Sequence, residues 1–213
     1  MSRLFETLSQ KPPETLIASE VARPSLSCPE FSLEHRRTLL GIAHQAIVCA
    51  LEREPFPEAP ALPAELSEAR GVFTTLYLDH DLRGCVGYAV PVGPLYRAVA
   101  ETARSAAFDD SRFLPVKEEE AARLEVSLSV LSRLFPIQPG AIEVGRHGLV
   151  ISQGGHRGLL LPQVPVEHGW GPEAFLQQAC RKAGLPLDAW RKSAIIEAFT
   201  AEVFSDPDVA GSV

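Results

Sequence analysis

The pattern of hydrophobic and polar residues predicts three amphipathic helices. The clearest covers residues 33–52 and begins after Ser32, a residue type that favours the N-cap of a helix. Apolar side chains recur there at helical spacing on one face: Leu39, Ala43, Ala46, Ile47 and Ala50. Residues 95–108 and 172–184 repeat the pattern, the first after Pro94 and the second ending at Gly184. Each helix is therefore expected to pack one face against a core.

Alternating and β-branched stretches predict strands between and after these helices. Residues 71–78 and 82–90, separated by Asp-His-Asp, are typical of a β-hairpin. Residues 124–132 alternate, with Leu124, Val126, Leu128 and Val130 expected on one side. Residues 141–162 contain glycine pairs that predict further hairpins, and residues 193–204 predict one apolar closing strand.

The order of these elements favours an α+β fold over a doubly wound sheet. Helices and hairpins are interspersed without a regular strand–helix alternation, which favours a mixed or antiparallel sheet with flanking helices. Prolines punctuate residues 1–31, so we expect a loosely ordered N-terminal extension there. The domain is expected to span residues 32–206, followed by a short tail over residues 207–213.

Composition and charge make several classes of partner unfavourable. The chain of 213 residues carries a net charge of −7, which disfavours contact with nucleic-acid backbones. No apolar run reaches the roughly 18 residues of a spanning helix, and the N-terminus lacks a secretory pattern. The cysteines are widely spaced, without a C-x-x-C motif: Cys28, Cys49, Cys85 and Cys180. We therefore expect a cytoplasmic protein with reduced thiols and no membrane segment.

The segment "LRGCVG", residues 82–87, is the strongest candidate for chemistry. Strand alternation would place Arg83, Cys85 and Gly87 on one face, with Arg83 roughly 7 Å from Cys85. A cation at that distance favours a thiolate, and Gly87 would leave a hollow beside the sulfur. The competing interpretation is a packed strand, because a free cysteine behaves as a small buried hydrophobe. The pattern alone leaves both open.

Other candidates have simpler alternatives. His147 lies between glycines and is a possible proton acceptor for a thiol, or else a turn residue. Asp110 and Arg112 follow a helix and form either a local ion pair or a substrate-positioning pair. Residues 153–158 could offer backbone amides to an anion. A hairpin turn at the glycine pair is the simpler explanation of this segment. Cys180 is predicted to be core, and no histidine spacing predicts a metal site.

Taken in order along the chain, several motifs resemble the AMMECR domain family, also called AmmeMemoRadiSam system protein A. The motifs are "LRGCVG", "SAAFDDSRF", "LEVSLSVL", "GRHGLVI" and "LLLPQVPVEHGW", followed by "FLQQACRKAGL". The resemblance covers roughly residues 32–204 and implies two subdomains with a cleft between them. It also implies these site residues: Arg83, Gly84, Cys85, Gly87, Ser105, Asp110, Arg112, Glu125 and His147.

The resemblance implies partners as well, a Memo-like protein and a radical S-adenosylmethionine protein.

The residues and the resemblance together lead to three hypotheses about function. The first is a substrate-handling or enzymatic component that binds a small anionic or peptide ligand, with Cys85 as nucleophile or acceptor, Arg83 as anion clamp and perturber of the thiol, and His147 as a candidate base. The second is a non-catalytic interaction module, and the third a nucleic-acid adaptor. The chain has no cysteine cluster for an iron–sulfur site, so we expect it to carry no metal or other cofactor of its own.

Overall fold

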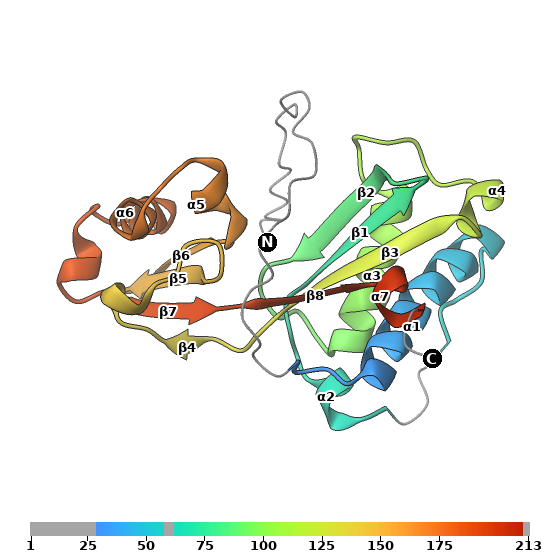
Figure 1. Cartoon of the computed structure of the whole chain (residues 1–213), viewed down its shortest axis with the longest axis horizontal. Helices are drawn as coiled ribbons and strands as arrows, with labels where there is room; N and C mark the ends of the chain where they lie inside the picture. The colour runs from blue at the N-terminus through green and yellow to red at the C-terminus, as the bar shows by residue number, and fades with distance from the viewer. Residues whose placement is uncertain (1–28, 58–61, 211–213) are drawn as a thin grey trace.

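A computed structural model describes residues 29–57 and 62–210 and divides them into two lobes, each built on a four-stranded antiparallel sheet. The strand order is β2-β1-β3-β8 in the first lobe, on the right of Figure 1. In the second lobe, on the left, the order is β4-β7-β5-β6. The predicted α+β architecture of antiparallel sheets with flanking helices is confirmed.

The first lobe contains the longer helices. Its elements are α1 (Leu33–Glu52), α2 (Ala64–Ser67), β1 (Val72–Leu78), β2 (Asp81–Tyr88), α3 (Leu95–Phe108), α4 (Glu118–Ala121), β3 (Leu124–Leu131), β8 (Ala201–Ser205) and α7 (Asp206–Ala210). Those of the second lobe are β4 (Phe135–Pro136), the short 3-10 helix η1 (Pro139–Ala141), β5 (Gly148–Gln153), β6 (His156–Leu160), α5 (Gln163–Glu167), α6 (Pro172–Lys182), the 3-10 helix η2 (Ala189–Arg191) and β7 (Ile195–Phe199).

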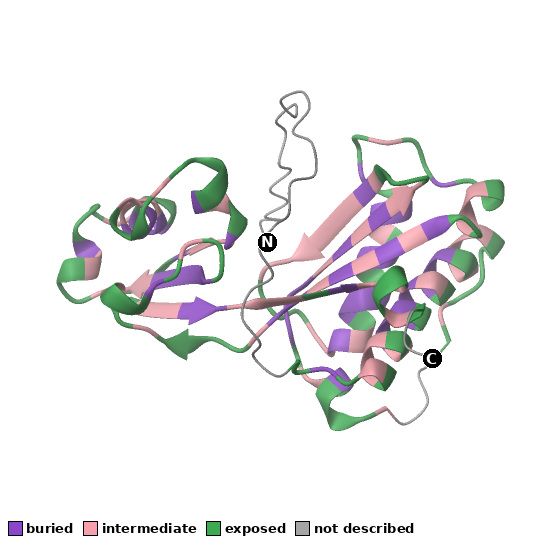
Figure 2. Cartoon of the chain, viewed as in Figure 1, coloured by how far each residue is buried: buried purple, intermediate pink, exposed green. Residues whose placement is uncertain are grey.

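Helices α1 and α3 cover one face of the first sheet. Helix α1 begins where expected, because the side chain of Ser32 accepts a hydrogen bond from the backbone N–H of His35. Its apolar face packs with α3 and with alternate residues of β1 and β3 in one core. Figure 2 shows the resulting alternation of buried and half-buried residues along β1 and β3. The side of β3 predicted to be buried is buried.

A separate core holds the second lobe together. Phe175, Leu176 and Ala179 of α6 pack against Leu149 of β5 in this core. Cys180 lies among them, fully buried, so its prediction as a core residue is confirmed. Burial raises the pKa of the Cys180 thiol, which keeps it protonated.

The chain crosses between the lobes twice, along neighbouring paths. One crossing joins β3 to β4, and the other joins β7 to β8. At the crossing the backbone N–H of Ser132 donates to the carbonyl oxygen of Thr200 at 2.8 Å, and the N–H of Thr200 donates to Oγ of Ser132 at 3.0 Å. Residues 193–204, predicted as one strand, are therefore divided at Thr200 into strands of different sheets.

A small core joins the lobes at the crossing. Leu131, at the end of β3, packs with Val150 of β5 and Phe199 of β7, and Phe73 of β1 packs against this cluster. Phe73 and Leu131 lie on the face of the first sheet that the helices leave uncovered. The second lobe therefore covers one end of that face.

The ends of the described chain are tied to the first lobe. Phe31, at the end of the predicted extension, is buried, and the backbone N–H of Glu30 donates to the carboxylate of Glu202 at 2.7 Å. Arg36 donates to the same carboxylate at 2.9 Å. Part of the predicted tail belongs to α7, whose Val209 packs against the core. None of the helices in the described ranges is long and apolar enough to cross a membrane.

We predict that Gly84→Ala destabilises the fold. A Cβ at Gly84 would lie 2.1 Å from the carbonyl oxygen of Ala106 in α3, so strand and helix would have to separate. Overpacking of this kind costs roughly 1–3 kcal/mol of unfolding free energy. Chemical denaturation measures the change.

Gly41→Ala is the matched control, because a Cβ at this exposed helical position meets nothing within 4 Å. It should stabilise the fold by about 0.5–1 kcal/mol, the difference in helix propensity. Equal effects of the two substitutions would contradict the close approach of β2 to α3.

Candidate functional site

The uncovered face of the first sheet carries a row of small polar side chains. Cys85 of β2 lies opposite Thr75 of β1, Thr75 opposite Ser127 of β3, and Ser127 opposite Ser205 of β8. We call these four residues the thiol–hydroxyl row. Residues directly opposite each other point to the same face, so one thiol and three hydroxyls cross the sheet in line. All four are half-buried, although none of the helices within residues 29–57 and 62–210 packs over them.

Cys85 is held on this face by its strand neighbours. The hydroxyl of Thr75 donates a hydrogen bond to Sγ of Cys85 at 3.3 Å. The ring of Phe73 lies over Gly87, where an added Cβ would come within 2.2 Å of ring carbon Cδ1. The expected hollow beside the sulfur is therefore filled by an aromatic ring from the neighbouring strand. Gly87 provides room for Phe73, and the thiol is only partly exposed.

Asp110 and Arg112 close the free edge of β2 at Cys85. The backbone N–H of Cys85 donates to Oδ2 of Asp110 at 2.9 Å, and Nη2 of Arg112 donates to the carbonyl oxygen of Cys85 at 3.2 Å. The guanidinium also binds both carboxylate oxygens of Asp110, at 2.9 and 2.7 Å. This pair satisfies the two backbone groups that an edge strand leaves unpaired.

The ionisation of this pair follows from its contacts. Burial by itself would raise the pKa of Asp110, whose side chain is 5% exposed. Hydrogen bonds from the Arg112 side chain and from the backbone of Cys85 outweigh burial, so the pKa lies below its usual value. Asp110 in turn raises the pKa of Arg112, with a smaller contribution from Cys85. A fixed cation therefore lies beside Cys85.

Arg83 does not occupy the place that strand alternation gave it. Leu76 lies opposite Gly84 but Tyr77 lies opposite Leu82, so Arg83 is the extra residue of a β-bulge. Its guanidinium forms a two-point ion pair with Glu120, at 3.1 and 3.0 Å. The hydrogen bonds from Arg83 lower the pKa of Glu120. This guanidinium is engaged within the protein, and Arg112 is the cation bonded to Cys85.

His147 lies in the second lobe, immediately before β5. It is buried, and its Nδ1 accepts a hydrogen bond from the backbone N–H of Glu143 at 3.0 Å. Its ring packs edge-on against Phe135, with centroids 5.9 Å apart. Burial lowers the pKa of His147 and keeps the imidazole neutral. Among the described residues, none of its hydrogen bonds or ring contacts reaches Cys85.

The remaining candidates fall in separate places. Glu125 lies on the uncovered face opposite Tyr77, one row beyond the thiol–hydroxyl row. The hydroxyl of Ser105, in the last turn of α3, donates to Asp109 at 3.1 Å. Gly84 faces α3 on the covered side of the sheet. Of the predicted residues, the structure brings Cys85, Asp110 and Arg112 into direct contact.

Thr75 and Ser127 were missed by the sequence reasoning. The alternation of "VFTTLYL" and "LEVSLSVL" already placed each residue on the polar side of its strand. Their alignment with Cys85 depends on the register of three strands, which the pattern does not give.

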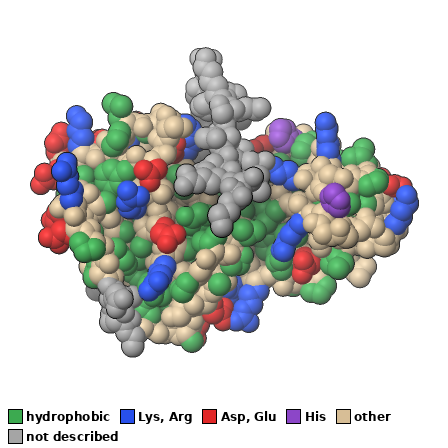
Figure 3. Space-filling view, turned by 180° about the vertical axis from the view of Figure 1, so that it is seen from behind, with side chains coloured by type: hydrophobic (Ala, Val, Ile, Leu, Met, Phe, Trp, Pro, Cys, Tyr) green, Lys and Arg blue, Asp and Glu red, His purple; other side chains and the backbone are tan. Residues whose placement is uncertain are grey.

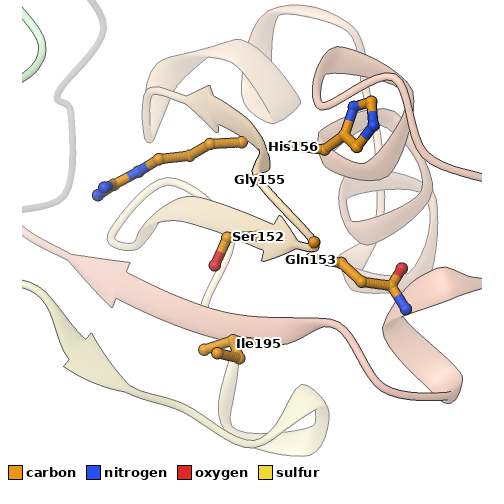
Figure 4. Close-up of a pocket in the computed structure, with 7 residues that line it drawn as sticks. Ser152, Gln153, Gly155, His156 and Ile195 are labelled. Carbon is orange, nitrogen blue, oxygen red and sulfur yellow. The ribbon is translucent and has the colours of Figure 1, made fainter.

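Two hollows lie away from Cys85. One, of about 320 Å³, lies at the β5–β6 turn, where Gly154 and Gly155 adopt positive φ and confirm the predicted hairpin. Figure 4 shows Ser152 beside Ile195 of the neighbouring strand, with His156 turned away from both. The second, of about 410 Å³, lies between α1 and α3.

Seen from behind in Figure 3, basic and acidic side chains are interspersed rather than gathered into a basic stripe.

We predict that Asp110→Asn lowers the unfolding free energy by about 1.5–3 kcal/mol, because it removes a charge-assisted contact to Arg112 and to the edge of β2. The pKa of Asp110 is lowered on folding, so its stabilisation is complete above the usual carboxyl pKa of about 3.9. It is lost as the pH falls through the lowered value. Denaturation of parent and variant should converge in acid, and a constant difference would contradict the ionic role.

We predict that His147→Ala destabilises the second lobe but leaves alkylation of Cys85 unchanged. The substitution removes the acceptor of the Glu143 N–H and empties the space of a buried ring that packs against Phe135, at a cost of about 1–3 kcal/mol. Because folding lowers the pKa of His147, the parent should lose stability as the pH falls below about 6.5, and the variant should lack that component. Slower alkylation of Cys85 in a folded variant would restore His147 as a candidate base.

Comparison with known proteins agrees with the motif resemblance. The AMMECR1 family model matches residues 40–204. A protein from Aquifex aeolicus is 40% identical over 186 residues, which cover 83% of this chain and 95% of that protein. One from Methanopyrus kandleri is 42% identical over 195 residues, 86% of this chain and 94% of its own. The crystal structure of an uncharacterised Pyrococcus horikoshii protein has 43% identity and a TM-score of 0.59, covering 78% of this chain and 89% of its own. This chain belongs to the AMMECR1 family.

Proposed function

We propose that this chain is a substrate-handling component of an enzyme system that also includes a Memo-like protein and a radical S-adenosylmethionine protein. In this proposal Cys85 is the thiol that meets the substrate. The observation that carries it is the position of Cys85, half-buried on an uncovered sheet face and bonded through its backbone to Asp110 and Arg112. A cysteine that served only packing would be expected inside a core, as Cys180 is.

The surroundings of Cys85 suit a sulfur that develops negative charge. A thiolate there would accept the hydrogen bond of Thr75 and interact with the guanidinium of Arg112, which also donates to the backbone carbonyl of Cys85. Asp110 fixes that guanidinium at two points, so the cation is already in place when a substrate arrives. Arg112 thus replaces Arg83 as the cation of the site.

The same face suggests the kind of ligand. The side chain of Arg112 is 39% exposed, and among the described residues Nη1 makes no hydrogen bond. That donor is available to a carboxylate or phosphate. The hydroxyls of Thr75 and Ser127 continue the polar row away from Cys85. A small anionic ligand, or a peptide with a carboxylate, fits this arrangement.

An interaction module is the second candidate, and one observation favours it. Leu114, two residues after Arg112, is 80% exposed, and Leu82 of β2 is 43% exposed. Exposed apolar side chains beside a shallow face are typical of a protein-docking surface. A nucleic-acid adaptor has less support, because the chain is acidic and the face in Figure 3 carries no basic stripe.

We predict that iodoacetamide alkylates Cys85 faster than Cys49 or Cys180 at neutral pH. The sulfur forms a bond to carbon, iodide leaves, and the thiol proton passes to the buffer. Peptide mass spectrometry of timed samples gives the rate at each cysteine. Arg112→Gln should slow Cys85 severalfold and leave Cys49 unchanged, because the cation assists only the sulfur beside it. Equal or slower labelling of Cys85 would refute a reactive thiol.

Reconstitution with the two partners separates the two candidate functions. Cys85→Ser nearly conserves volume, so a chemical role predicts lost activity with little change in unfolding. Leu114→Ser is the matched surface variant, and a docking role predicts weaker association with the thiol reaction intact. Full activity of the folded Cys85→Ser protein would exclude the thiol from the function.

A further inference from the structure

A second site is formed on the helical side of the first lobe. The hollow of about 410 Å³ is bounded by the second half of α1, by residues 96–104 of α3 and by the segment that follows α1. Its volume lies within the range of about 300–1,000 Å³ that is typical of ligand pockets. Cys85 lies on the uncovered side of the sheet, so this hollow is separate from the site proposed above.

The floor of the hollow is apolar and made of small residues. Ala46 and Ala50 of α1 and Ala100 of α3 contribute only methyl groups, which leaves the space open. Phe56 and Tyr96 supply aromatic walls. The floor and walls therefore favour an aliphatic or aromatic group.

The turn after α1 brings the remaining wall into place. Arg53 ends α1 in the left-handed conformation, with φ of 60°, and the backbone N–H of Glu54 donates to the carbonyl oxygen of Cys49 at 2.8 Å. The chain is thereby turned back so that Glu54 and Phe56 line the hollow. The start of this wall is held by backbone hydrogen bonds to α1, and Phe56 packs against the core of the first lobe.

Two opposite charges line the hollow without neutralising each other. Glu54 lies on the segment after α1, and Arg97 on α3. Neither forms an ion pair with any described residue, although both face the same space. The Nε of Arg97 donates to the hydroxyl of Tyr96 at 3.1 Å, which orients the guanidinium and leaves its two Nη groups for another acceptor.

The other charged lining residues have partners within the protein. Arg104 pairs with Asp109 at 3.2 Å, and Glu101 accepts a hydrogen bond from the hydroxyl of Tyr88 at 3.4 Å. Glu54 is therefore the acid of the hollow whose carboxylate has no hydrogen-bond partner among the described residues, and Arg97 is the base of the hollow that forms no ion pair with them. An apolar space between one acid and one base is complementary to a molecule that carries both charges.

We infer that this hollow binds a small zwitterion with an apolar body, the class to which aliphatic and aromatic α-amino acids belong. The ammonium group pairs with Glu54, the carboxylate with Arg97, and the side chain lies against Ala50 and Ala100. A simple anion would leave Glu54 unpaired, and a simple cation would leave Arg97 unpaired. An uncharged apolar molecule would leave both charges without a partner.

Cys49 provides a reporter inside the hollow. It is half-buried and lines the space, so a bound molecule shields its thiol. Protection of Cys49 from iodoacetamide, read by peptide mass spectrometry, locates binding in this hollow. Calorimetry gives the affinity independently.

The experiment titrates the full chain with L-phenylalanine and L-leucine up to millimolar concentration. We expect at least one to bind and to slow alkylation of Cys49 without slowing that of Cys85. The one-charge analogues 3-phenylpropionate and phenethylamine should bind at least tenfold more weakly than L-phenylalanine. Failure of both amino acids to bind, or equal binding of either analogue, would overturn the inference.

Variants complete the test. Glu54→Gln and Arg97→Gln should each weaken binding at least tenfold, and Ala50→Trp should abolish it by filling the space. Glu52→Gln and Val48→Trp are matched controls at exposed positions of α1 outside the lining, and both should bind like the parent. Unchanged binding in folded Ala50→Trp protein, or equal losses in the controls, would also overturn the inference. The binding of amino acids in this hollow and the reactivity of Cys85 are tested separately, so failure of one proposal does not decide the other.

Discussion

The contact between the lobes through Phe73 is the constraint from which much of the structure follows. Its ring extends from the uncovered face of the first sheet, packs against the core that joins the lobes, and covers the backbone at Gly87. A larger residue at position 87 would displace that ring, and a smaller one at position 73 would leave the junction unfilled. The glycine of "LRGCVG" thus serves lobe packing and places Cys85 at the boundary of the covered region.

The edge of the first sheet imposes a second requirement. β2 has a partner strand on one side only, and its backbone at Cys85 would otherwise present unpaired groups to water or to another chain. Asp110 and Arg112 take the place of a further strand there. One arrangement therefore protects an edge strand and fixes a cation beside a thiol. This dual role explains how a structural ion pair could also support chemistry.

Helix α3 connects the two sites that we propose. Its first half lines the hollow between the helices, with Tyr96 and Arg97, and the loop after its end carries Asp110 and Arg112. Its backbone also touches Gly84 of β2 directly. The sites lie on opposite sides of one sheet, so a ligand in the hollow and a substrate at Cys85 would not compete for space.

The sequence by itself determined the three longer helices, most of the strands, the covered side of β3 and the family, because periodicity and motif order are local properties. It placed Ser32 at a helix start, Val126 in a core and Cys180 among buried residues, and the structure agrees. Tertiary structure decided which side chains meet. The bulge turned Arg83 toward Glu120, strand register aligned Thr75 with Cys85, and burial in the second lobe engaged His147 elsewhere. Those outcomes depend on pairing between distant segments, and one-dimensional patterns do not encode that pairing.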